Sequence, residues 1–284
     1  MVDSMENSKT NDLPVIILRP SRGWLSINFK ELWRYRELVF FLTWRDIKVR
    51  YKQAALGIAW AVLQPILTMV VFTVIFGNLL GTPSSDVPYP LFSLAALLPW
   101  QLFSTALQRS SISLVGNANL ITKVYFPRLA IPLASVFAVL LDFMISFVVL
   151  LCVMFYYGYW PTWNMLWLPL LVLFALMTAL AVGLWFSALN VQYRDVQHMV
   201  PFISQVWMYA SPIVYPIETI PDGIWRWLYG LNPMVGVIQG FRWAILGGSP
   251  PDITMLISVA MVLILLVSGL YYFRRMEKTF ADIV

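Results

Sequence analysis

The chain has 284 residues, of which 60% are hydrophobic and 12% charged, and its mean hydropathy is +0.75. This composition excludes an ordinary soluble globular domain and indicates an integral membrane protein. A single Cys and a single His exclude a disulfide framework and a Cys/His metal cluster. The net charge of +5 does not indicate a nucleic-acid partner, because the cations are distributed as in a membrane protein.

Residues 1–31 are polar, and their apolar run, 13–18, is short and contains Pro14. A signal peptide needs a longer, uninterrupted apolar core. We therefore expect a cytoplasmic N-terminal tail over 1–31 and a transmembrane domain over 32–284.

Residues 32–53 are predicted to form an amphipathic helix in the plane of the membrane. Helical spacing places Phe40 and Trp44 on one face and Arg45, Lys48 and Lys52 on another. Aromatic residues opposite Lys and Arg are typical of a helix in the membrane interface. No charged residue occurs from 53 to 85, so the chain then has ample length to cross a bilayer.

Windows poor in charge predict six spanning helices in an all-α fold, at about 57–80, 91–114, 129–156, 164–189, 199–214 and 253–273. With a cytoplasmic N-terminus, all 19 Lys and Arg except Arg226 and Arg242 lie on the cytoplasmic side. This asymmetry follows the positive-inside rule, and it places both termini in the cytoplasm.

Residues 221–246 do not fit a spanning helix. Asp222 is placed to cap a short helix that ends near Tyr229, and Asn232 with Pro233 is a typical start for a second helix. Each helix is too short to cross about 30 Å of hydrocarbon. Two re-entrant half-helices are the preferred interpretation, and two interfacial helices lying flat are the alternative.

Polar residues within the predicted spans allow two interpretations. Trp60, Gln64 and Thr68 share one face of the first span, and Ser204 and Gln205 belong to a similar stripe in the fifth. Such stripes indicate either a hydrated path or hydrogen bonds between helices.

Small residues recur at four-residue intervals in the fourth predicted span. Ala175, Ala179, Gly183 and Ser187 form this face, which predicts close packing against another helix.

Asp142 is the one acid deep within a predicted span, where a charge is costly. It is either a proton or cation relay or a buried group with a structural partner, and the second interpretation is preferred. Residues 119–126 are predicted to form a short cytoplasmic helix, capped by Asn119 and ending before Pro127. This helix either exposes apolar residues to a partner or packs under its own bundle.

Catalytic motifs are missing from the sequence. No GxxxxGK[ST], HExxH or GxSxG pattern occurs, so we expect neither ATP binding nor a catalytic residue in this chain. Residues 239–243, QGFRW, match the QxxRW pattern of processive glycosyltransferases. The segment falls on the predicted outer face without a DxD motif, and we interpret the match as chance.

Three segments carry a family resemblance. WRDIKVRYKQAALGIAWAVLQP (44–65), YRDVQHMVPFISQVWMYASPIVYP (193–216) and GLNPMVGVIQGFRWAILG (230–247) resemble signatures of permease subunits of type-2 ABC exporters for cell-surface polysaccharides. That group exports O-antigens, capsules and teichoic acids.

The resemblance implies a homodimer with two separate ATPase subunits, which use ATP and Mg, in the bacterial inner membrane. It implies export of a polyprenyl-pyrophosphate-linked polysaccharide, with O-antigen favoured over capsule, teichoic acid, or a small lipid or drug. A membrane glycosyltransferase and an assembly scaffold are remote alternatives.

The resemblance also implies roles for four groups of residues. The channel and its sugar-stacking surfaces would involve Trp60, Gln64, Thr68, Gln205, Trp207 and Tyr209. The lipid pyrophosphate or lipid head groups would contact Arg45, Lys48, Arg50 and Lys52. The ATPase would contact Asn119, Leu120, Lys123, Val124 and Tyr125. The outer gate would include Asp222, Trp225, Trp227, Asn232 and Pro233.

Overall fold

The computed structural model describes residues 29–52, 57–84, 87–221, 223–248 and 250–280, and within these ranges all regular structure is helical. The helices are α1 (Phe29–Arg34), α2 (Arg36–Lys52), α3 (Gly57–Phe72), α4 (Tyr89–Gly116), α5 (Ala118–Lys123), α6 (Ala130–Phe137), α7 (Leu140–Tyr156), α8 (Leu168–Gln192), α9 (Val196–Tyr209), α10 (Ile224–Gly230), α11 (Pro233–Leu246) and α12 (Ile253–Glu277). The prediction of an all-α protein is confirmed. Most of the expected tail lies outside the described residues.

Five stretches within the described residues are long and apolar enough to cross a membrane: Ala59–Leu79, Tyr89–Gly116, Ala130–Tyr156, Trp163–Gln192 and Ile253–Glu277. They correspond to five of the six predicted spans. The remaining predicted span, 199–214, corresponds to α9, which has 14 residues and a length of about 21 Å. The six-span topology therefore stays a prediction.

Two of the predicted helices differ from the structure in detail. The helix expected over 199–214 ends at Tyr209, because Pro212 disfavours helical backbone at Ser211. The helix expected over 129–156 is interrupted after Phe137 and resumes at Leu140. Neither Pro nor Gly occupies this break, so the sequence contains no conventional signal for it.

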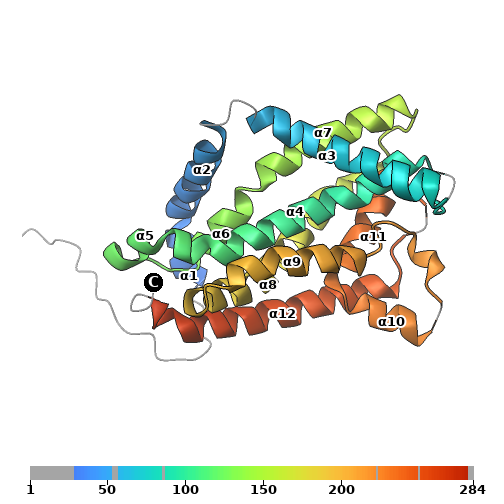
Figure 1. Ribbon diagram of the computed structural model, residues 1–284. Coiled ribbons are helices and arrows are strands. Elements are labelled where there is room, and N and C mark those ends of the chain that lie inside the picture. The colour runs from blue at the N-terminus through green and yellow to red at the C-terminus, as the bar shows by residue number, and fades with distance from the viewer. Residues whose placement is uncertain (1–28, 53–56, 85–86, 222, 249, 281–284) are drawn as a thin grey trace, which may run out of the picture.

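Helix α4 is the centre of the bundle (Figure 1). Every residue from Leu91 to Trp100 is buried, and α4 contacts α3, α6, α7, α8, α9 and α11. The predicted small-residue face of α8 is part of this core. Ala175, Ala179, Gly183 and Ser187 are all buried, and α8 packs directly on α4, so the packing prediction is confirmed.

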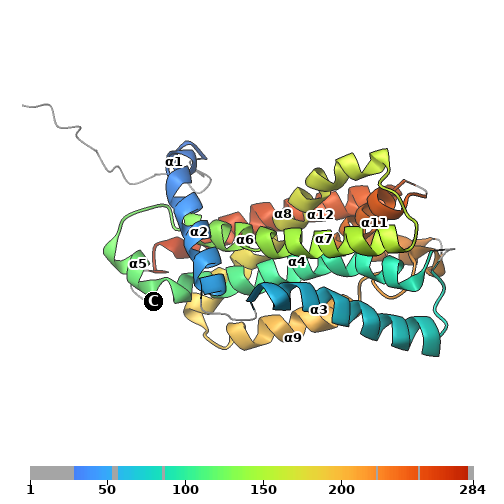
Figure 2. The ribbon, with the colours of Figure 1, turned by 90° about the horizontal axis from the view of Figure 1, so that it is seen from above.

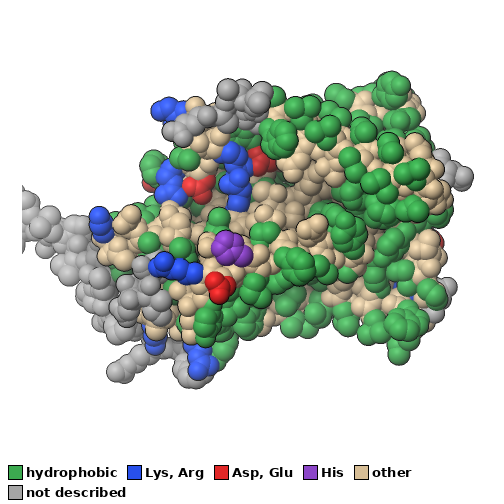
Figure 3. All heavy atoms as spheres, in the orientation of Figure 1, with side chains coloured by type: hydrophobic (Ala, Val, Ile, Leu, Met, Phe, Trp, Pro, Cys, Tyr) green, Lys and Arg blue, Asp and Glu red, His purple; other side chains and the backbone are tan. Residues whose placement is uncertain are grey.

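Helix α2 crosses one end of the bundle instead of running along it (Figures 1 and 2). The single helix expected over 32–53 is divided by a turn at Tyr35 into α1 and α2. Val39 and Leu42 are buried, whereas Phe40 and Trp44 remain exposed. Lys and Arg side chains gather at this end of the molecule, and hydrophobic side chains cover most of the rest of this face (Figure 3).

The two short helices before α12 differ in burial. Helix α11 lies inside the bundle against α4, α8 and α12, and Val235, Val237 and Phe241 are completely buried. Helix α10 packs on α12 and leaves Trp225 and Trp227 exposed. Both helices occur where the sequence predicted them, but only α11 is enclosed by the bundle.

The close approach of α8 and α4 gives a test of the core. A Cβ atom added to Gly183 would lie 2.8 Å from the Ser110 Cβ, a distance that side chains do not tolerate without movement. We expect Gly183→Ala to lower the free energy of unfolding by about 1–3 kcal/mol, as overpacked cores do. Thermal unfolding of the detergent-purified protein measures this change.

Gly116→Ala is the matched control, because a Cβ at Gly116 meets no atom within 4 Å. An equal effect of both substitutions would contradict the proposed packing.

Candidate functional site

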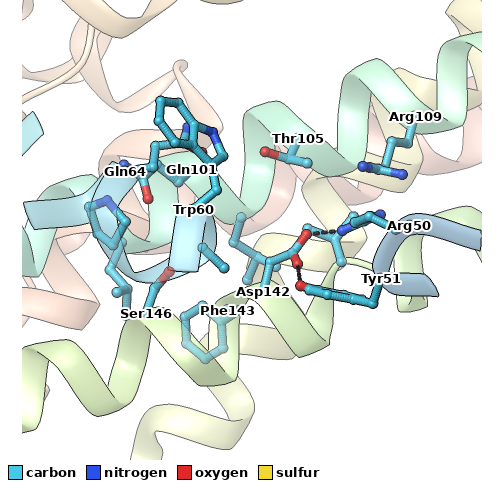
Figure 4. A pocket seen from close by; sticks show the side chains of 15 residues that line it. Arg50, Tyr51, Trp60, Gln64, Gln101, Thr105, Arg109, Asp142, Phe143 and Ser146 are labelled. Atoms are coloured by element: carbon cyan, nitrogen blue, oxygen red, sulfur yellow. Dashed lines mark hydrogen bonds and ion pairs between the residues drawn. The ribbon is translucent and has the colours of Figure 1, made fainter. Parts of the chain in front are cut away.

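A cavity of about 480 Å³ lies between the end of α2 and the helices α3, α4 and α7 (Figure 4). Its wall combines charged, amide, hydroxyl and apolar side chains. The polar and charged residues are Arg50, Tyr51, Gln64, Gln101, Thr105, Arg109, Asp142 and Ser146. The apolar residues are Trp60, Ala61, Pro65, Leu98, Leu102, Val139 and Phe143.

Asp142 receives two hydrogen bonds from α2. The Arg50 Nη1 atom donates to Oδ2, and the Tyr51 hydroxyl donates to Oδ1, as the dashed lines in Figure 4 mark. Asp142 lies in the first turn of α7, where the helix dipole also favours a negative charge. The acid therefore has a structural partner, as the preferred interpretation of the sequence expected.

The sequence did not indicate that Arg50 is the partner of Asp142. Arg50 is 92 residues away from Asp142 in the chain, and the two meet only because α2 folds across the end of the bundle. No local spacing rule connects residues at that separation.

Arg109 projects from α4 into the same cavity and was also missed. Within the described parts of the chain, it forms no hydrogen bond and no ion pair. Burial, and to a lesser degree the nearby charge of Arg109, lowers the pKa of Arg50 to about 10. Arginine side chains remain charged at neutral pH in proteins, so the cavity wall carries two cations and one anion.

The four cations predicted to contact lipid do not form one cluster. Arg45 is paired with Asp46 at 2.8 Å and donates to the Asn117 Oδ1 atom at 2.7 Å. The Lys48 ammonium lies 5.6 Å from the centre of the Trp44 ring, and Lys52 is exposed. Only Arg50 lines the cavity.

The residues predicted to line a channel are also divided. Trp60 and Gln64 line the cavity, but Thr68 does not. Gln205 and Tyr209 are exposed on α9, on the outside of the single chain.

Trp207 has a packing role in the single chain. Its Nε1 donates to the Asn232 Oδ1 atom at 2.9 Å, and its ring contacts the edge of Phe103.

The predicted ATPase-contacting helix is shorter than expected. It begins at Ala118 and ends at Lys123, because the backbone is extended at Val124. Asn119 is not the cap; Asn117 precedes the helix, and its side chain binds Arg45 and the Ser113 carbonyl instead. Four of the five predicted contact residues are exposed, and Leu120 is half-buried; the exposed ones are Asn119, Lys123, Val124 and Tyr125.

Of the predicted gate residues, Asp222 lies outside the described part of the chain. The start of α11 is confirmed, since the Asn232 side chain accepts a hydrogen bond from the Met234 N–H at 3.0 Å and Pro233 is the first helical residue. Trp225 and Trp227 lie exposed on α10.

The QGFRW segment lies within α11, and its side chains form packing contacts and hydrogen bonds with the rest of the bundle. Phe241 is fully buried, and the Gln239 Oε1 atom accepts a hydrogen bond from the Thr254 hydroxyl. Arg242 donates to the Ile213 and Tyr215 carbonyls. These contacts account for the segment without a catalytic role.

Apolar helices long enough to cross a membrane, with a charged cavity beside a transverse helix, define a multi-pass helical membrane protein. The chain belongs to the ABC-2 type transporter family, which matches residues 37–246.

Similar proteins cover nearly the whole chain. It is 34% identical to the O-antigen export system permease protein RfbA of Myxococcus xanthus, over 87% of this chain and 96% of that protein. It is 30% identical to the protein of the same name from Klebsiella pneumoniae, over 87% of this chain and 95% of that one. It is 26% identical to the polysialic acid transport protein KpsM of Escherichia coli, over 82% and 91% of the two chains.

The contact between Arg50 and Asp142 can be measured by a double-mutant cycle with Arg50→Gln and Asp142→Asn. Each single substitution leaves one charge without its partner in a largely enclosed place, whereas the double variant removes both charges. We expect a coupling free energy of about 1–3 kcal/mol in thermal or chemical unfolding.

The Arg45–Asp46 pair is the control, because its arginine is more exposed than Arg50 and it joins neighbouring residues. Its cycle should give at most about 1 kcal/mol. A coupling near zero for Arg50 and Asp142 would show that their contact does not stabilise the fold.

Proposed function

We propose that this chain is the channel-forming membrane subunit of an ATP-driven exporter of polysaccharide in the bacterial inner membrane. The observation that carries the proposal is the similarity to O-antigen export permeases over almost their full length. O-antigen, linked to polyprenyl pyrophosphate, is therefore the favoured cargo. The similarity to a polysialic acid transport protein makes another cell-surface polysaccharide the alternative.

Energy for export would come from two copies of a separate ATPase that uses ATP and Mg. The surface of α5 and the residues after it supports this assignment, because Val124 and Tyr125 are 53% and 69% exposed. Exposed apolar groups at the cation-rich, cytoplasmic end suit a protein partner. The hydrogen bond between Arg45 and Asn117 would couple movement of α5 to movement of α2.

The working unit would be a homodimer with the polymer channel between the two copies. Helix α3 supports this arrangement, since its apolar surface is mostly exposed and also carries the exposed amide of Gln64. Trp60 and Tyr209 are each 57% exposed, and in a dimer their rings would offer flat surfaces to sugars. Thr68, Gln205 and Trp207 would contribute to the same path.

The outer end of the channel would be closed by α10 and α11 as re-entrant half-helices. The burial of α11 supports insertion over a flat interfacial position, and the exposed Trp225 and Trp227 of α10 would remain near the surface. At the cytoplasmic end, Arg45, Lys48, Arg50 and Lys52 would meet lipid head groups or the arriving pyrophosphate.

The ATPase contact is tested by changing Tyr125. We expect Tyr125→Ala combined with Val124→Ala to reduce recovery of the ATPase with the tagged chain about 10-fold or more, because exposed aromatic anchors dominate such interfaces. Co-purification from membranes that express the chain and the proposed ATPase partner measures the effect.

Tyr156→Ala is the control, since Tyr156 is 84% exposed at the opposite end of the bundle. If no ATPase co-purifies even with the unaltered chain, the exporter proposal is wrong. The cargo is tested separately: deletion of the gene should leave lipid-linked polymer on the cytoplasmic side of the inner membrane.

A further inference from the structure

The cavity beside α2 contains more hydrogen-bond donors than its own residues satisfy. Each guanidinium group carries five N–H bonds, and Asp142 accepts from only one nitrogen of Arg50. The Arg50 Nε and Nη2 atoms are buried and have no hydrogen-bond partner among the described residues. The Arg109 guanidinium group likewise forms no hydrogen bond with any of the described residues. Unsatisfied charged donors are costly, so the cavity is built to receive acceptors.

The charge of the wall selects an anion. Arg50 and Arg109 exceed Asp142 by one positive charge, and the neighbouring Arg45 and Asp46 neutralise each other. Two planar guanidinium groups that face one space suit the oxygens of a phosphate, which they bind through paired hydrogen bonds.

The rest of the wall selects a lipid chain. Trp60, Pro65, Leu102 and Phe143 provide an apolar surface in the same cavity that Arg50 and Arg109 line. Figure 4 shows Trp60 and Phe143 among its lining side chains. A small hydrophilic anion would gain nothing from this surface. The cavity volume of about 480 Å³ is within the range of about 300–1,000 Å³ typical of ligand pockets, which is enough for a head group and the first part of a chain.

The position along the bundle agrees with this ligand. Arg109 is seven residues before the end of α4 at Gly116, or about 10 Å along the helix. Arg50 is at the end of α2, the helix predicted to lie in the membrane interface. With α2 in the predicted interfacial position, both cations would lie at the depth where lipid phosphates meet hydrocarbon.

We infer that this cavity binds the phosphate end of a lipid-linked phosphate or pyrophosphate, clamped between Arg50 and Arg109, with the adjoining hydrocarbon against Trp60 and Phe143. Asp142 holds Arg50 in place when the cavity is empty and is its counter-ion. The identification of this lipid as the carrier of the exported polymer rests on the proposed function. The binding of a lipid phosphate does not.

Equilibrium binding of radiolabelled polyprenyl pyrophosphate to the purified, full-length chain tests the inference. Arg109→Gln should weaken binding about 10- to 100-fold, as expected for lost charged hydrogen bonds. Arg109→Lys should restore part of the affinity, because it returns the charge without the planar fork. Arg275→Gln removes an exposed cation outside the cavity and should change nothing.

A second variant distinguishes loss of the binding site from a folding defect. Ala61→Phe keeps every charge but fills the apolar part of the cavity, and it should also weaken binding about 10-fold or more while the protein remains monodisperse. Unchanged binding in both Arg109→Gln and Ala61→Phe would overturn the inference.

Competing unlabelled compounds distinguish the sources of the phosphate. Polyprenyl pyrophosphate should compete strongly, and polyprenol and inorganic pyrophosphate weakly. Equal competition by phosphatidylglycerol would support the lipid-phosphate site but overturn its assignment to the polymer carrier. If inorganic pyrophosphate competes as strongly as polyprenyl pyrophosphate, the hydrocarbon chain does not contribute to binding, and the inference of a lipid ligand is wrong. Loss of ATPase co-purification with intact lipid binding would instead contradict the proposed function alone.

Discussion

A carboxylate in a membrane helix requires a partner, and Asp142 finds it in α2. Placing such a charge at depth costs at least about 2.5–3.5 kcal/mol on insertion scales, and hydrogen bonds from Arg50 and Tyr51 offset that cost. The contact fixes the end of α2 against the beginning of α7, across the end of the bundle. The contact places Arg50 in the cavity wall, and it adds to the packing of α2 on α6.

The rest of the structure consists of a closely packed centre and exposed apolar surfaces. Small residues on α8 let α4 approach closely, and the buried α11 extends this core toward the end of the molecule opposite α2. The residues after α5 and the exposed faces of α3 and α9 leave apolar groups uncovered in the single chain. The proposed homodimer and the proposed ATPase partner would use such surfaces. The Arg45–Asn117 hydrogen bond links the end of α4 to α2, and α2 in turn borders the cavity.

The sequence predicts the elements well where the physical cause is local. Windows poor in charge located the five apolar stretches, four-residue spacing identified the packing face of α8, and Asn232 with Pro233 marked the start of α11. The break between α6 and α7 has no Pro or Gly and was missed. Most of the site could not be predicted, because no motif marks Arg109 and the partner of Asp142 is 92 residues away in the chain. Tertiary folding, which no periodicity encodes, brings these side chains together.

The docking of α2 is tested most directly by a distance between spin labels at Val49 on α2 and Met144 on α7, both exposed positions. The exposed Cys152 is first replaced by Ser, so that the labels attach only where intended. In lipid nanodiscs, with unlabelled chain in excess, the account predicts one narrow distance distribution that becomes broad or shifts in Asp142→Asn. An identical narrow distribution in Asp142→Asn would contradict the claim that this carboxylate holds α2 in place.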